Sequence, residues 1–122
     1  KLEKYKYKIE PKVKGVHYLI DFEEVPFNSL NDQVYLTTMF ETALTISNMN
    51  VLNKKIHKFE PQGLTGFYLL SESHLSFHTW PENGTISIDL YTCGDFKLAK
   101  DAINSILNTL KNYPYKLKKL CR

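Results

Sequence analysis

The stretch from residue 66 to residue 91 constrains the fold of this chain most strongly, because it predicts consecutive strands joined by short turns. Residues 66–70 (GFYLL) predict a buried strand, and residues 75–80 predict a second short strand. The turn 81–84 (PENG) ends that strand. Polar and apolar residues then alternate through residues 85–91, as in a strand with one buried face. We therefore expect a β-sheet at the centre of the protein.

The flanking segments predict further strands and two amphipathic helices. Residues 16–22, 51–59 and 115–120 predict strands. Apolar residues recur at helical spacing over about 36–49, after a capping segment at 29–32, and again over 96–110. The order β-α-β-β-β-β-α-β is typical of an α+β fold: a two-layer α/β sandwich with a mainly antiparallel sheet and both helices on one face. Because these helices cover only one face, we expect a homodimer to cover the other.

The composition is that of a single globular domain spanning residues 1–122, with 43% hydrophobic and 24% charged residues. No apolar run approaches the roughly 20 residues of a membrane span, and the N-terminus shows no apolar signal segment. We expect Cys93 and Cys121 to be free thiols in a reducing, cytoplasmic compartment. The net charge of +3 is mild, and we interpret the lysines near both ends as solvated termini. We therefore expect neither nucleic acid nor a membrane as a partner.

The peptide bond between Glu72 and Ser73 is a candidate for self-cleavage. A serine hydroxyl can attack the carbonyl of the preceding residue and convert the amide into an ester. β-Elimination leaves dehydroalanine, which hydrolyses to a pyruvoyl group and ammonia, so the chain would be cut into 1–72 and 73–122. The resulting ketone can form a Schiff base with an amine substrate and act as an electron sink. Taken alone, Ser-Glu-Ser is more simply read as a surface loop.

Two neighbouring residues could supply the proton transfers. His78 is the candidate base for removing the Ser73 α-proton, although a regular strand places positions 73 and 78 on opposite faces, and His74 is the alternative. Cys93 is the candidate acid, because a thiol of pKa about 8.5 is largely protonated at neutral pH. Gly94 beside it permits close backbone approach. Ordinary packing or surface roles are the structural alternative for the histidines and the cysteine.

Two residues are candidates for holding a nucleoside. Glu82, in the turn after Pro81, could accept hydrogen bonds from ribose hydroxyls, and Phe59 could stack on adenine. A solvated turn carboxylate and an ordinary core aromatic are the alternatives.

The motif SESHLSFHTWPE, followed by DLYTCG, resembles the signature of S-adenosylmethionine decarboxylase proenzymes of the short bacterial and archaeal type. The similarity continues upstream through residues 56–66 and, more loosely, over roughly residues 15–114. It implies an α/β sandwich that forms dimers with active sites at the subunit interface. It also implies cleavage between Glu72 and Ser73, a pyruvoyl cofactor made from Ser73, and neither a metal nor pyridoxal phosphate.

The resemblance also implies a role for each matched residue. His78 falls on the processing histidine, Cys93 on the catalytic acid, Glu82 on the ribose-binding acid and Phe59 on an aromatic near the adenine. Thr65 stands where the family commonly has a serine that assists processing.

The implied activity is decarboxylation of S-adenosylmethionine to the aminopropyl donor for spermidine synthesis. The chain departs from the family at Asn83 and Thr85 and in its short C-terminal segment. A pyruvoyl-dependent ornithine or arginine decarboxylase, or a relative that binds a ligand without cleaving itself, are the alternatives.

Overall fold

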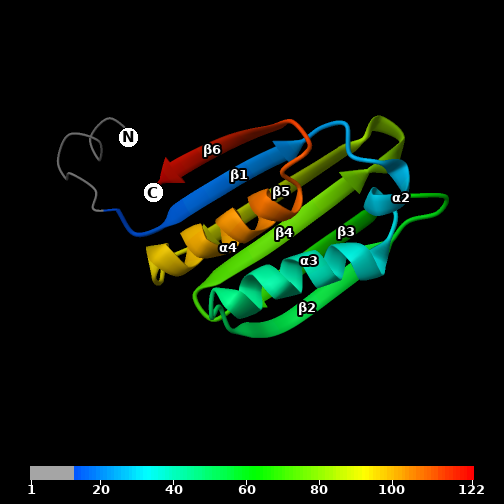
Figure 1. The fold of residues 1–122 in the computed structure, drawn as a ribbon. Helices are drawn as coiled ribbons and strands as arrows, with labels where there is room; N and C mark the ends of the chain where they lie inside the picture. Colours follow the sequence, from blue (N-terminus) through cyan, green and yellow to red (C-terminus); the bar gives the residue numbers. More distant parts are fainter. Residues whose placement is uncertain (1–12) are drawn as a thin grey trace, which may run out of the picture.

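The computed structural model describes residues 13–122, so the lysine-rich segment 1–12 lies outside the described residues. A six-stranded sheet in the order β2-β3-β4-β5-β1-β6 forms one layer, and every neighbouring pair of strands is antiparallel. The two long helices lie side by side on one face of this sheet (Figure 1). The elements are β1 (Val16–Phe22), α2 (Phe27–Leu30), α3 (Gln33–Ile46), β2 (Val51–Lys58), β3 (Leu64–Leu70), β4 (Ser73–Trp80), the 3₁₀ turn η1 (Pro81–Asn83), β5 (Thr85–Thr92), α4 (Phe96–Thr109) and β6 (Tyr115–Cys121).

The predicted fold class and the order of the main elements are confirmed, with differences at their boundaries. The first long helix begins at Gln33, where the Asp32 carboxylate accepts the Tyr35 backbone N–H at 3.0 Å, and it ends at Ile46, before the left-handed Asn48. Helix α2 was not predicted, because four residues are too few to show a helical period. Strand β4 begins at Ser73, earlier than predicted, since Ser73 pairs with both neighbouring strands.

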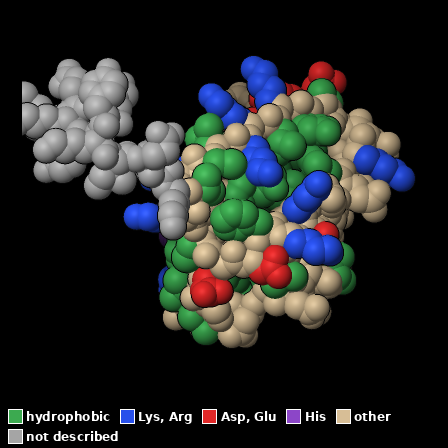
Figure 2. Space-filling view, turned by 90° about the vertical axis from the view of Figure 1, so that its left-hand side faces the viewer, with side chains coloured by type: hydrophobic (Ala, Val, Ile, Leu, Met, Phe, Trp, Pro, Cys, Tyr) green, Lys and Arg blue, Asp and Glu red, His purple; other side chains and the backbone are tan. Residues whose placement is uncertain are grey.

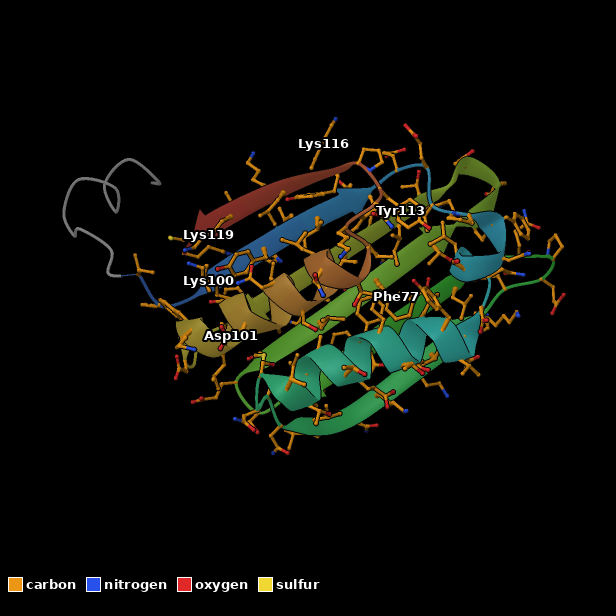
Figure 3. All side chains as sticks on the ribbon, viewed as in Figure 1. Phe77, Lys100, Asp101, Tyr113, Lys116 and Lys119 are labelled. Atoms are coloured by element: carbon orange, nitrogen blue, oxygen red, sulfur yellow. The ribbon has the colours of Figure 1, made fainter. Side chains whose placement is uncertain are left out.

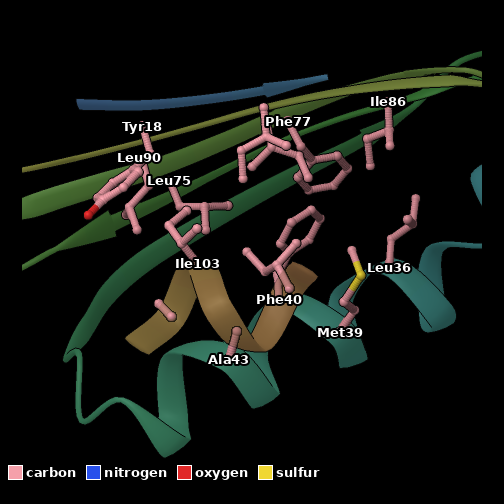
Figure 4. Packing of buried hydrophobic residues seen from close by; sticks show 14 of the residues in the cluster. Tyr18, Leu36, Met39, Phe40, Ala43, Leu75, Phe77, Ile86, Leu90 and Ile103 are labelled. Carbon is pink, nitrogen blue, oxygen red and sulfur yellow. The ribbon is translucent and has the colours of Figure 1, made fainter. Parts of the chain in front are cut away.

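Helices α3 and α4 bury their apolar faces against the inner face of the sheet. Phe40 of α3 stacks on Phe77 of β4 with ring centroids 4.5 Å apart (Figure 4), and Phe77 points from β4 toward the helices (Figure 3). Gly66 on β3 makes room for this ring, because a Cβ there would collide with it. Burial of large apolar side chains of this kind contributes about 1.5–3 kcal/mol each. This packing holds β3, β4 and β5 in one rigid frame.

The outer face of the sheet has no covering element among residues 13–122. Large apolar side chains on this face are well exposed, with 42% for Phe67, 44% for Leu69 and 40% for Trp80. The imidazoles of His74 and His78 on β4 lie beside Phe67 and Trp80, with ring centroids 5.8 Å and 6.1 Å apart. An exposed face of mixed aromatic and polar residues is typical of a surface that packs against another molecule.

Basic residues mark the edge of the sheet formed by β6. Every residue of this strand is exposed, and Lys116 and Lys119 project from it (Figure 3). At the end of the molecule where β6 finishes, Lys and Arg side chains lie among hydrophobic ones (Figure 2). Charged side chains on an edge strand disfavour pairing with a strand of another molecule. No helix in the described part of the chain has the length and apolar character needed to cross a membrane.

Candidate active site

The Glu72-Ser73 bond lies at the tight turn between β3 and β4, where Leu70 and Ser73 are paired. Ser73 is the first residue of β4 and lies opposite Thr92, the last residue of β5. The Ser73 hydroxyl donates to Thr92 Oγ1 at 2.8 Å. Thr92 Oγ1 also accepts the Gly94 backbone N–H at 3.0 Å, so the threonine hydroxyl has a fixed position. The serine hydroxyl is therefore oriented by a buried neighbour.

The carbonyl oxygen of Glu72 faces hydrogen-bond donors of Cys93. The backbone N–H of Cys93 donates to this oxygen at 2.9 Å, and Cys93 Sγ lies 3.2 Å from it. Thr92 Oγ1 lies 3.5 Å away, at the limit of a hydrogen bond. Donors about 2.7–3.1 Å from a carbonyl oxygen stabilise the negative charge that forms there when a nucleophile attacks. The geometry thus suits attack of a hydroxyl on the Glu72 carbonyl.

The turn that contains the Glu72-Ser73 bond is held from both sides. The Asn50 side chain donates to Ser71 Oγ at 2.9 Å, and the Ser71 N–H donates to the Asn50 carbonyl at 3.1 Å. On the other side, a Cβ on Gly94 would collide with the Glu72 side chain, so glycine leaves room for that side chain. These contacts fix Glu72 against the end of β5.

A small pocket of about 130 Å³ opens beside the bond, between the end of α3 and the start of α4. Its lining includes the polar side chains of Ser73 and Thr92 and the apolar side chains of Met49 and Leu98. Pockets that enclose a drug-sized molecule are about 300–1,000 Å³. This pocket can therefore take only a few atoms of a nucleoside-sized ligand.

The remaining candidate residues lie at the opposite end of β3 and β4. Thr65 and His78 are paired across these strands, with Thr65 Oγ1 3.0 Å from His78 Nδ1. Glu82 in η1 accepts a hydrogen bond of 3.4 Å from Gln62. Phe59, directly after β2, packs edge-on against His57 with ring centroids 4.5 Å apart. We call these four predicted residues, Phe59, Thr65, His78 and Glu82, the distal group.

One chain does not bring the distal group to Ser73. Ser73 and His78 are five positions apart along β4, which at about 3.3 Å per residue amounts to about 16–17 Å. Ser73 shares its face of β4 with the buried Leu75 and Phe77, whereas His78 is exposed on the outer face. The alternative base, His74, also lies on the outer face, 3.4 Å from the Asp89 carboxylate. Of the site residues predicted from the sequence, only Glu72, Ser73 and Cys93 lie next to one another within one chain.

Thr92 was not singled out from the sequence, although it belongs to the DLYTCG motif. It is 1% exposed and contacts the hydroxyl and the carbonyl that cleavage would join. The available signal was the alternation of β5, which turns Thr92 to the same face as Leu90 and Ile88. A polar residue on the buried face of a strand needs a hydrogen-bond partner, and here that partner is the candidate nucleophile.

Comparisons with known proteins agree with this geometry. The family model described as S-adenosylmethionine decarboxylase matches residues 16–122. An S-adenosylmethionine decarboxylase proenzyme of Prochlorococcus marinus (strain MIT 9313) is 41% identical over 104 residues, which cover 84% of this chain and 83% of that protein. One from Thermoplasma volcanium is 37% identical over 108 residues, covering 88% and 83% of the two chains. The crystal structure of the adenosylmethionine decarboxylase from Aquifex aeolicus VF5 superimposes with a TM-score of 0.84 at 31% identity, covering 92% of each chain.

Proposed function

The chain belongs to the S-adenosylmethionine decarboxylase family, and we propose that it cleaves itself at Glu72-Ser73 and then decarboxylates S-adenosylmethionine. The product would be the aminopropyl donor for polyamine synthesis. The single observation that carries this proposal is a serine hydroxyl held by Thr92 next to a carbonyl that is already bound by the Cys93 N–H at 2.9 Å. The relatives above, which are named as proenzymes, support the same conclusion.

The cleavage proceeds by serinolysis. Ser73 Oγ attacks the Glu72 carbonyl carbon, and the negative charge that forms on the carbonyl oxygen is stabilised by the Cys93 N–H. The C–N bond then breaks, its nitrogen takes a proton, and an ester joins Glu72 to Ser73. A base removes the Ser73 α-proton, and the Glu72 carboxylate leaves. Hydrolysis of the resulting dehydroalanine gives a ketone at residue 73 and ammonia, and divides the domain into 1–72 and 73–122.

The residues around Ser73 fit the pyruvoyl group that this reaction would leave. The group would take the place of Ser73 at the start of β4, beside the adjoining pocket of about 130 Å³. When present, it supplies a carbonyl that binds an amine and withdraws electrons. Cys93 holds a thiol proton beside residue 73, since its Sγ is 3.2 Å from the Glu72 carbonyl oxygen. This proton is the one we assign to the acid step after carbon dioxide leaves.

The base and the nucleoside contacts come from a second copy of the chain. The uncovered outer face carries Phe67, Leu69 and Trp80, which are each at least 40% exposed and suit packing against a second sheet. In a two-fold dimer, the distal end of one sheet lies over the Ser73 end of the other, and the reverse contact forms at the same time. His78 of the distal group would then act on Ser73 of the partner, with Thr65 fixing its ring at 3.0 Å. Phe59 and Glu82 of that copy would hold adenine and ribose at the Glu72-Ser73 turn on the outer side of the sheet, opposite the small pocket on the helix side.

The nucleoside substrate is favoured over a basic amino acid. A small diamino acid needs neither an aromatic platform nor a ribose-binding carboxylate, and both are present as Phe59 and Glu82. The relatives above are named for S-adenosylmethionine, not for ornithine or arginine. The oriented Ser73 hydroxyl also argues against a relative that never cleaves itself. We place the enzyme in the cytoplasm, with no nucleic-acid or membrane partner.

Ser73→Ala tests the proposal directly. The parent chain should separate into two fragments on a denaturing gel, and mass spectrometry should find fragment 73–122 with a pyruvoyl N-terminus in place of serine. The purified parent should release carbon dioxide from S-adenosylmethionine and not from ornithine or arginine. Ser73→Ala should remain one chain without activity. Two fragments from Ser73→Ala, or a preference for ornithine or arginine, would contradict the proposal.

A further inference from the structure

A cluster of two imidazoles and one carboxylate lies on the outer face of the sheet, opposite the face that carries the Ser73 hydroxyl. His17, His74 and Asp89 come from β1, β4 and β5, three neighbouring strands. His17 and His74 both pair with Tyr91, one on each side, and Asp89 lies in the next row between Leu19 and Ser76. Because side chains two residues apart share a face, Asp89 stands between the two imidazoles.

The ligand atoms of this cluster converge on a small volume. Asp89 Oδ2 lies 2.8 Å from His17 Nε2 and 3.4 Å from His74 Nε2, and the three ligand atoms are all within 4.8 Å of one another. In a tetrahedral zinc site with bonds of about 2.1 Å, two ligand atoms are about 3.4 Å apart. The distance from His74 to Asp89 already has this value, and the distance from His17 to Asp89 reaches it with an opening of about 0.6 Å.

We propose that His17, His74 and Asp89 form a binding site for a divalent transition ion of the Zn²⁺ class. Two neutral imidazoles and one carboxylate are a ligand set suited to Zn²⁺ and its late first-row neighbours, whereas Mg²⁺ and Ca²⁺ prefer oxygen ligands alone. The site offers three protein ligands, so water or another group would complete the coordination.

Neighbouring side chains hold the ligands in place for an ion. The Ser76 hydroxyl donates to the other carboxylate oxygen of Asp89, Oδ1, which leaves Oδ2 directed at both imidazoles. The His74 ring stacks on Phe67 with centroids 5.8 Å apart, and the His17 ring packs edge-on against Tyr91 at 5.5 Å. Hydrogen bonds to a ligating carboxylate and fixed ring orientations are general features of metal sites in proteins.

One carboxylate lies between two imidazoles, which would bind the ion in their neutral form. The cleavage route proposed above uses His78 as the base and no residue of this cluster. In the proposed dimer the ion would lie between the two sheets, still at one per chain.

The test is titration of the purified protein with Zn²⁺ by calorimetry and with Co²⁺ by visible absorption, in a chelator-treated sample. Ser73→Ala serves as the parent, so that binding is measured without cleavage or turnover. We expect one ion per chain, and a cobalt spectrum of nitrogen and oxygen ligands without thiolate charge-transfer bands. The absence of thiolate bands distinguishes binding at this site from binding at Cys93 or Cys121, the two free thiols.

Matched histidine variants locate the ion. The full sequence contains four histidines, so His57→Gln and His78→Gln are controls for the two outside the cluster. We expect Asp89→Asn and His17→Gln to weaken binding by more than about 100-fold, and Ser76→Ala, which removes only the orienting hydroxyl, to weaken it by about 10–100-fold. Both controls should bind like the parent. Absence of stoichiometric binding, or equal binding by Asp89→Asn and the parent, would overturn the proposal, whatever the outcome for decarboxylation.

Discussion

The hydroxyls of Ser73 and Thr92 lie 2.8 Å apart across β4 and β5, and the Thr92 oxygen also accepts the Gly94 N–H at 3.0 Å. Thr92 is 1% exposed, so the serine is anchored to a buried group and not to water. The anchor holds the hydroxyl beside the carbonyl that it must attack. We therefore propose Thr92 as a positioning residue for the cleavage.

Thr92→Val should slow cleavage by about tenfold or more, because it keeps the shape of the side chain but removes the hydrogen bonds to Ser73 and Gly94. It should also lower the free energy of unfolding by about 1–3 kcal/mol, since the Gly94 N–H loses its acceptor. Thr92→Ser keeps the hydroxyl and should restore most of the cleavage rate. The rate is measured on denaturing gels after synthesis in a cell-free system. Equal cleavage by Thr92→Val and Thr92→Ser would show that the hydroxyl does not position Ser73.

Mixed dimers should reveal whether His78 acts on the partner chain. By itself, the His78→Ala chain should stop at the ester intermediate, because the elimination step lacks its base. Added hydroxylamine should cut this ester and so reveal it. Co-production with Ser73→Ala should restore cleavage of the His78→Ala chain, since the Ser73→Ala partner supplies an intact His78. Affinity tags of different size identify the cut chain.

The matched control pairs His78→Ala with a chain that carries both substitutions, and this pair should not be cut. If His78→Ala matures at the parental rate by itself, His78 is not the base, and His74 becomes the residue to test.

Cys93→Ala should separate maturation from turnover. The Cys93 N–H at 2.9 Å from the Glu72 carbonyl is a backbone group and survives the substitution, so the chain should still be cut. The thiol proton is lost, and general acid catalysis contributes about 10²–10⁴-fold. The decarboxylation rate per mature site should fall by a factor in that range, measured as carbon dioxide released per pyruvoyl group. Cys121→Ala, at the end of β6, is the control and should retain parental activity. A Cys93→Ala rate within about threefold of the parent would remove the thiol from the mechanism.

Stability should depend on the ionisation of Asp89. Its pKa in the folded protein is lower than in the unfolded chain, so the carboxylate stabilises the fold at pH values above the unfolded pKa of about 3.9. That contribution to stability declines as the pH falls through the pKa of Asp89 in the folded protein, where the carboxyl becomes protonated. In metal-free urea unfolding experiments, the stability difference between the parent and Asp89→Asn should therefore narrow between about pH 5 and pH 2. A difference that stays constant over this range would contradict the inferred direction of the pKa shift.

The sequence by itself determined the local structure and the candidate bond for cleavage. The alternation through β5 and the apolar face of α4 follow from the order of residue types, because each element buries one side. The Glu72-Ser73 bond could also be proposed from the sequence, since nucleophile and carbonyl are neighbours in the chain. The sequence parity of positions 73 and 78 predicted opposite faces, as the structure has them.

Only the tertiary structure decided which distant residues meet. Thr92 reaches Ser73, and Cys93 reaches the Glu72 carbonyl, through the antiparallel register of β4 and β5. His17 joins His74 and Asp89 although 72 positions separate it from Asp89 along the chain. Such encounters depend on strand order and register, which are set by the packing of a whole sheet against α3 and α4. That packing cannot be predicted from the few residues that precede and follow each of these side chains in the sequence.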